Sequence, residues 1–147
     1  MQFHSTRDNS ISVSSAQAIK QGLSNEGGLF VPDSFPKVGF DEIEALAEMS
    51  YHDRAYFVLS KFLTDFSEAD LKACIKNAYT KEKFGTDAIA PVYKLDDKQY
   101  FLELWHGPTC AFKDMALQIL PHFLTTAMRM TAEEKEIIIL VATSGDT

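Results

Sequence analysis

The run Ile137-Ile138-Ile139-Leu140-Val141-Ala142 restricts the fold more than any other part of the chain. Six consecutive apolar residues, most of them β-branched, are typical of a strand that is covered on both faces of a parallel sheet. The run therefore predicts an α/β fold. Such a strand needs neighbours, and the rest of the 147 residues offers one long helix and at most a hairpin. We expect a fragment of a longer protein, and the unpaired strand edge favours self-association.

The residues before position 90 predict a mostly helical unit. Ser14, Asp41 and Ser67 each stand where a helix N-cap is expected, with Gln or Glu or an apolar stripe following at helical spacing. Gly85 stands where the third of these helices is expected to end. The stripe of this third helix is expected to be buried and consists of Leu71, Cys74, Ile75, Ala78 and Tyr79.

The sequence changes character near Ala90-Pro91, which we take as a domain boundary. The prediction is a mostly helical N-terminal domain over residues 1–90, followed over residues 91–147 by the truncated start of a three-layer α/β domain. A helix preceding the final strand is part of that start.

Two further elements are predicted after the boundary. Residues 92–95 and 100–104 alternate enough to pair as a hairpin. Residues 113–130 are apolar nearly all round, so we expect a deeply buried helix with a kink or break at Pro121, which cannot donate a backbone hydrogen bond. Trp105, between these elements, is expected in the core.

Charge and composition exclude several classes of protein. Lys and Arg number 14 against 21 Asp and Glu, and the net charge of −7 repels the phosphates of nucleic acids and acidic membranes. No apolar run approaches the roughly 20 residues that cross a bilayer. Cys74 and Cys110 form no disulfide framework, so we expect a reducing, cytoplasmic location. The histidines show no metal-ligand spacing, and no metal site is predicted.

The segment from Glu103 to Asp114 holds the densest group of unusual residues. Lys113 stands at the start of a helix, where partial positive charge and an apolar setting both favour the uncharged amine. An uncharged lysine amine attacks carbonyl carbons, so the segment predicts a Schiff-base nucleophile. The alternative is a solvated lysine at a helix end, because most lysines are exposed. Asp114 is expected to stabilise the helix N-terminus.

The turn Thr143–Thr147 follows the predicted strand. Ligands of open α/β sheets bind at the carboxyl ends of strands, and the free N–H groups of a glycine turn bind phosphate or carboxylate. Two other functions stay open. One is a phosphate- or nucleotide-binding α/β domain, although the Gly-x4-Gly-Lys-Ser/Thr spacing is absent. The other is a non-enzymatic interaction module in which the lysine segment only connects a strand to a helix.

The residues from His106 to Asp114 resemble the lysine segment of the threonine synthase family, and Thr143–Thr147 resembles the turn that follows it there. Ser5-Thr6-Arg7-Asp8, Gln21-Gly22-Leu23 and the stretch from Gly27 to Pro32 resemble the N-terminal domain of that family. The family comprises fold-type II enzymes that use pyridoxal 5'-phosphate to convert O-phosphohomoserine and water to threonine and phosphate. The resemblance implies this activity for the parent enzyme.

The resemblance also implies roles for single residues. Lys113 is the catalytic lysine that binds the cofactor and moves protons at substrate carbons, Phe112 packs beside the cofactor ring, and Asp146 lies near its 3'-oxygen. The residues implied in substrate binding are Ser144, Gly145 and Thr147 at the carboxylate, and His106 and Thr109 at the phosphate. The groups that hold the cofactor phosphate and the pyridine nitrogen are implied to follow residue 147, so we expect the chain alone to be inactive.

Overall fold

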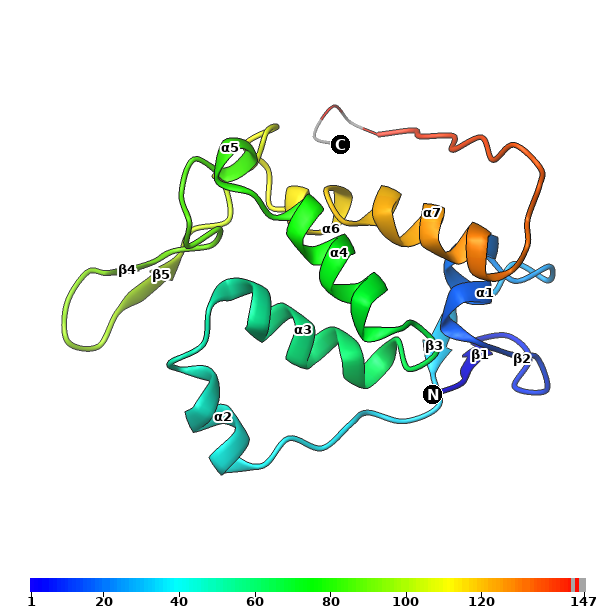
Figure 1. Cartoon of the computed structure of the whole chain (residues 1–147), viewed down its shortest axis with the longest axis horizontal. Coiled ribbons are helices and arrows are strands. Elements are labelled where there is room, and N and C mark those ends of the chain that lie inside the picture. Colours follow the sequence, from blue (N-terminus) through cyan, green and yellow to red (C-terminus); the bar gives the residue numbers. More distant parts are fainter. Residues whose placement is uncertain (144, 146–147) are drawn as a thin grey trace.

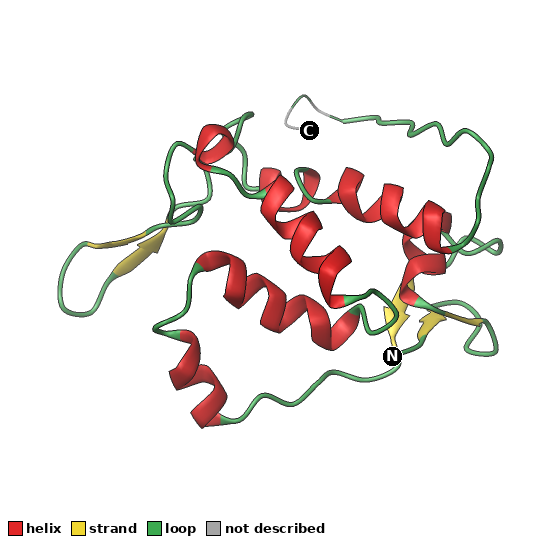
Figure 2. Cartoon of the chain, viewed as in Figure 1, coloured by secondary structure: helices red, strands yellow, loops and turns green. Residues whose placement is uncertain are grey.

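The computed structural model describes residues 1–143 and 145, which fold into short helices and two small antiparallel sheets (Figure 1). The helices are α1 (Ser15–Gln21), α2 (Phe40–Leu46), α3 (Tyr51–Phe62), α4 (Glu68–Ala78), α5 (Lys81–Phe84), α6 (Asp114–Leu117) and α7 (Leu120–Met130). The strands are β1 (Phe3–Ser5), β2 (Ser12–Val13), β3 (Phe30–Pro32), β4 (Val92–Lys94) and β5 (Tyr100–Leu102). The chain is therefore mixed α/β, and helices predominate (Figure 2).

Two of the predicted N-caps are confirmed. The Ser14 hydroxyl accepts a hydrogen bond from the backbone N–H of Gln17 at 3.2 Å and begins α1. The Ser67 hydroxyl accepts from the N–H of Asp70 at 3.1 Å and begins α4. Each hydroxyl satisfies one of the N–H groups that the first turn of a helix leaves unpaired.

Two predicted helix boundaries are wrong. The N-cap of α2 is Gly39 and not Asp41, because the Glu42 carboxylate reaches back to accept from the Gly39 N–H at 2.8 Å. Gly85 ends the four-residue helix α5 in a left-handed conformation, whereas α4 ends earlier, at Ala78, with Tyr79 as its C-cap. In α2, the hydrogen bond from the Gly39 N–H to the Glu42 side chain places the N-cap two residues before Asp41.

The core lies between α1, α3, α4 and α7. The predicted stripe on α4 is buried, with Ile75 1% and Ala78 0% exposed. Helix α7 packs against α1 and α4, and the rings of Phe66 and Phe123 meet edge to face with centroids 5.9 Å apart. Residues on both sides of position 90 therefore share one core. Its buried members are Ala16, Leu63, Phe66, Leu71, Cys74, Ile75, Ala78, Tyr79, Phe84, Ile89, Ile119, Phe123 and Ala127.

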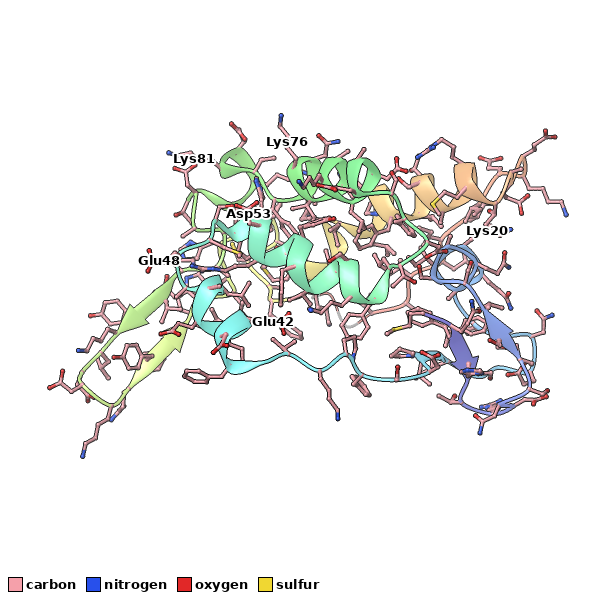
Figure 3. The ribbon with its side chains drawn as sticks, turned by 60° about the horizontal axis from the view of Figure 1, so that its bottom comes forward. Lys20, Glu42, Glu48, Asp53, Lys76 and Lys81 are labelled. Atoms are coloured by element: carbon pink, nitrogen blue, oxygen red, sulfur yellow. The ribbon has the colours of Figure 1, made fainter. Side chains whose placement is uncertain are left out.

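Charged side chains surround this core. Lys76 and Lys81 point away from the helices, and Glu42 lies on α2 (Figure 3). Lys20 on α1 pairs with Glu133 beyond the end of α7 at 3.3 Å.

No helix in the part of the chain that the structure describes has the length and apolar character needed to cross a bilayer.

The segment 113–130 forms two helices and not one. α6 and α7 are separated at Gln118 and Ile119, and Pro121 lies in the first turn of α7, where a backbone N–H is not needed. The predicted break is confirmed, and it falls just before the proline. The expected deep burial is wrong for part of the segment, because Leu120 is 39% exposed while Phe123 and Ala127 face the core.

The predicted hairpin is confirmed. β4 and β5 pair antiparallel, with Val92 opposite Leu102. The hairpin extends away from the helices (Figure 1), and the residues of both strands are exposed on both faces. Trp105, expected in the core, is 52% exposed, because it follows this outlying hairpin and does not lie over the helices.

The predicted strand over Ile137–Ala142 is wrong for this structure. The segment has no regular structure, and Leu140 is 92% exposed. It runs back along the molecule from the end of α7 (Figure 1), and its first four residues line a cleft of about 470 Å³ together with residues of α1 and α7. A strand requires a hydrogen-bonded neighbour, and within residues 1–143 and 145 none pairs with this segment.

Candidate functional site

Lys113 lies at the N-cap position of α6, and its side chain is half-buried. Its Nζ is 5.8 Å from the centroid of the Phe112 ring, which is itself 63% exposed. Because α6 has only four residues, the dipole behind Lys113 is that of one turn, weaker than the dipole of the long helix expected from the sequence. The location beside a helix start is confirmed, and the uncharged amine stays a prediction.

Asp114 is the centre of the lysine segment. Its side chain is 0% exposed, and its Oδ2 accepts from the Thr109 N–H at 2.8 Å and from the Thr109 hydroxyl at 3.0 Å. Its Oδ1 is buried and has no hydrogen-bond partner among the residues that the structure describes. The carboxylate therefore ties the turn before Lys113 to the helix after it.

This role of Asp114 was missed in the sequence. We assigned Asp114 only an interaction with the helix N-terminus, because acidic residues are common there. The sequence does carry a signal for this role, because Asp114 follows the threonine of a Gly-Pro-Thr turn by five residues. At this spacing a carboxylate can accept a hydrogen bond from an N–H of the turn. Thr109 is expected near the substrate phosphate, but in the structure its backbone N–H and its hydroxyl both donate to the Asp114 carboxylate. Its contact with substrate stays a prediction.

His106 is held at the edge of the same segment. Its Nε2 lies 2.7 Å from Oε2 of Glu103, and its ring stacks on Trp105 with centroids 5.9 Å apart. Both His106 and Glu103 are partly buried. His106, Thr109 and Lys113 thus lie on one segment, which runs through turns and bends at residues 107–113 before α6. Their convergence on one ligand stays a prediction.

The terminal turn lies mostly outside the described residues. Ser144, Asp146 and Thr147 belong to that part, so their predicted roles stay predictions. Gly145 is exposed with φ +113°, and its N–H donates to the Thr143 hydroxyl at 2.9 Å.

The N-terminal sequence motifs meet each other away from the lysine. The Ser5 hydroxyl on β1 donates to the Glu26 carboxylate, and the Ser24 hydroxyl donates to the same carboxylate at 2.6 Å. These hydrogen bonds, from Ser24 and then Ser5, lower the pKa of Glu26. A side chain at Gly28 would place its Cβ 2.0 Å from the Ser5 hydroxyl, so only glycine fits there. This cluster joins β1 to the turn before β3. It gives a structural role to the motif that begins at Ser5 and to the motif that contains Gly28.

Comparison with known proteins gives one consistent family. Residues 2–79 match the family model described as "Threonine synthase N terminus". Threonine synthase from Methylobacillus glycogenes is 37% identical over 154 aligned residues, which cover 100% of this chain and 32% of that protein.

Solved structures agree with this match. The PLP-bound threonine synthase from Brucella melitensis superposes with a TM-score of 0.82 at 34% identity, covering 90% of this chain and 28% of that chain. Threonine synthase from yeast superposes with a TM-score of 0.80 at 33% identity, covering 91% and 28%. The chain therefore spans about a third of the length of the relatives that it matches.

Proposed function

The chain belongs to the threonine synthase family, and we propose that it supplies the lysine side of an active site that converts O-phosphohomoserine and water to threonine and phosphate. The observation that carries the proposal is the position of Lys113, which follows a turn tied down by a buried carboxylate and remains partly accessible. The match to the Methylobacillus protein spans the whole chain and so includes this segment.

The residues around Lys113 fit pyridoxal phosphate, which we propose as the cofactor. The half-buried Lys113 amine is accessible to an aldehyde, and the exposed Phe112 ring offers a flat apolar face beside it. When bound, this cofactor withdraws electrons from the substrate carbon that reacts. Lys113 would hold this cofactor through Nζ, and the same amine would accept and return protons at the substrate carbons.

The remaining site residues enter the proposal with the roles that the family resemblance implies. The N–H groups of the turn at Ser144, Gly145 and Thr147 receive the substrate carboxylate, and Asp146 lies near the cofactor. His106 borders the substrate phosphate and is already oriented by its contact with Glu103.

We also propose the finer architecture. Residues 1–90 form the N-terminal domain, and residues 91–147 begin a three-layer cofactor domain. Support comes from the exposure of Ile138, Ile139 and Leu140, which are 77%, 56% and 92% accessible. Apolar residues so exposed are typical of a surface that another part of an assembly covers.

The test is a chimera in which residues 1–147 replace the matching segment of the Brucella melitensis enzyme. We expect this protein to release phosphate and form threonine from O-phosphohomoserine. Lys113→Ala is expected to lower the rate by about a hundredfold to ten-thousandfold, the range for loss of a general acid–base group. The matched control is Lys81→Ala, which removes an exposed lysine on α5. An active Lys113→Ala chimera would contradict the proposal.

A further inference from the structure

Asp114 is the one carboxylate that is fully buried among residues 1–143 and 145. Burying a carboxylate costs several kcal/mol unless hydrogen bonds compensate. Here only Oδ2 has donors, while Oδ1 has none in the described part of the chain. An apolar side chain of similar size would fill this site without that loss of hydration. Stability alone therefore does not explain a carboxylate at this position.

The turn before Lys113 is shaped around this carboxylate. A Cβ on Gly107 would lie 2.4 Å from the Asp114 Cβ and 2.5 Å from its Oδ2, so the backbone passes directly over the side chain. Cys110 adopts φ +57°, which is uncommon for a residue other than glycine, and its N–H donates to the Gly107 carbonyl at 3.0 Å. Such a conformation persists only where the surroundings enforce it.

A second contact holds the first turn of α6. The Tyr79 hydroxyl donates to the Met115 carbonyl at 2.7 Å, two residues after Lys113. Burial, and then the neighbouring Tyr51, raise the pKa of Tyr79, so the phenol remains a donor over the whole physiological range. Along the chain, Lys113 thus lies between the Thr109 turn and the Met115 carbonyl, and hydrogen bonds hold both.

We propose that Asp114 is a positioning residue for Lys113. Its carboxylate binds Thr109 and fixes the turn 107–110 against the first residue of α6, and this sets the direction in which the Lys113 amine projects. Asp114 acts through hydrogen bonding geometry and does not itself touch the substrate. The inference rests on the proposed function, because it concerns the lysine that holds the cofactor.

The first measurement needs no cofactor and uses the 147-residue chain. Amide hydrogen exchange at Thr109 is expected to accelerate about tenfold to a hundredfold in Asp114→Ala, the equivalent of losing a hydrogen bond to a charged group. Asp114→Asn keeps an acceptor oxygen and is expected to retain most of the protection. Unchanged exchange in Asp114→Ala would overturn the proposed tie between the turn and the helix.

The second measurement uses the chimera loaded with pyridoxal phosphate. The fraction of folded protein labelled at Lys113 after borohydride reduction, and the visible band of the lysine-bound cofactor, report the placement of the amine. We expect Asp114→Ala to lower this labelling about tenfold or more and to shift the band. Asp114→Asn is expected to stay within about threefold, because it keeps the geometry while removing the charge. A loss in Asp114→Asn equal to that in Asp114→Ala would overturn positioning by hydrogen bonding.

Asp65 provides the matched control. Its carboxylate also accepts from a hydroxyl, that of Ser15, and from a backbone N–H, that of Ala16 at 3.0 Å, but it is more exposed and serves α1. Asp65→Ala is expected to lower stability and leave labelling per folded molecule unchanged. Equal losses in both alanine variants would reduce Asp114 to a structural residue.

Two outcomes separate the inference from the proposed function. If Asp114→Ala does not fold, Thr109→Val decides, since it removes one donor, keeps the carboxylate and is nearly isosteric. Unchanged exchange at the 107–110 turn together with unchanged labelling in Thr109→Val would overturn the inference. If the unsubstituted chimera never labels at Lys113, the proposed function fails, while the exchange measurement still decides the role of Asp114.

Discussion

Two apolar regions of this chain meet opposite environments. On α4, Ile75 is 1% exposed, whereas in the segment 137–142 Leu140 is 92% exposed. Their side chains are of similar size and hydrophobicity. The difference lies in the backbone, because a helix forms its hydrogen bonds within one segment and a strand forms them only with a neighbour. Helix α4 has α3 and α7 to cover its apolar face, and the described part of the chain provides no strand beside residues 137–142.

This contrast separates a helical region that buries its apolar residues from two regions that leave theirs exposed. Local helices with N-caps find partners within the first 130 residues and bury a shared core. The hairpin β4–β5 and the segment 137–142 keep their apolar residues in contact with solvent. The lysine segment lies in the sequence between the hairpin and the segment 137–142. Hydrogen bonds of Asp114 and Tyr79 connect it to the helices.

The largest expected effect is in the core. Ile75→Ala removes a side chain that is 1% exposed, and we expect the free energy of unfolding to fall by about 3 kcal/mol through lost burial and a cavity. Urea denaturation of the chain measures this value. A loss below about 1 kcal/mol would mean that α4 is not packed as the structure has it.

A smaller effect is expected where the core meets α6. Tyr79→Phe removes the hydroxyl that donates to the Met115 carbonyl and leaves this acceptor unpaired, which we expect to cost about 1 to 2 kcal/mol in urea denaturation. Tyr93→Phe, on the exposed hairpin, is the matched control and is expected to change nothing measurable. Equal effects of the two substitutions would show that the hydrogen bond from Tyr79 to Met115 does not stabilise α6.

The stability of the α1 end should depend on acid. Burial alone would raise the pKa of Asp65, but hydrogen bonds from Ser15 and the Ala16 N–H outweigh it and lower the pKa below 3.8. A carboxyl with a lowered folded-state pKa stabilises the fold above its unfolded value and loses this contribution as the pH falls through the folded value.

Asp65→Asn tests this acid dependence. Between about pH 5 and about pH 2, the wild-type chain is expected to lose more stability than the variant, and the difference is modest because solvent screens a partly exposed group. Urea denaturation at both pH values measures it. Identical losses in the two proteins would contradict the role of this carboxylate.

The smallest expected effect is in the exposed run. Leu140→Asp should change the unfolding free energy of the chain by less than about 0.5 kcal/mol, because the side chain is already in solvent. In the chimera the same substitution is expected to prevent correct assembly, since an apolar surface that becomes covered excludes an unpaired carboxylate. A folded, active Leu140→Asp chimera would contradict the proposal that this exposed apolar run is covered in the assembled enzyme.

Much of the fold could be predicted from the sequence because its signals are local. The N-caps at Ser14 and Ser67 and the stripe on α4 depend on residues within a turn or two. The break near Pro121 follows from a missing N–H. The segment 137–142 was mispredicted because a run of apolar, β-branched residues shows that the segment could form a buried strand. The run does not show whether a neighbouring strand is present to pair with it. Trp105 was misplaced for a related reason, since hydrophobicity does not say which surface will cover it.

The candidate site was predicted unevenly. Lys113, Phe112 and His106 were selected because the motif is specific. Asp114 was assigned an ordinary helix role, since its burial depends on how closely Gly107 approaches it, and that is a tertiary property. The ties from Thr109 and Tyr79 to α6 cross five and 36 residues of sequence, and only the structure connects them.

The proposed active site depends most on the Lys113 amine, and one measurement tests this residue directly. The chimera is incubated with pyridoxal phosphate, reduced with borohydride, digested and analysed by mass spectrometry. The predicted result is one dominant pyridoxyl-lysine in the peptide that contains Phe112 and Lys113, lost in Lys113→Ala. Label spread over exposed lysines such as Lys76 and Lys81, or none at Lys113, would contradict the assignment.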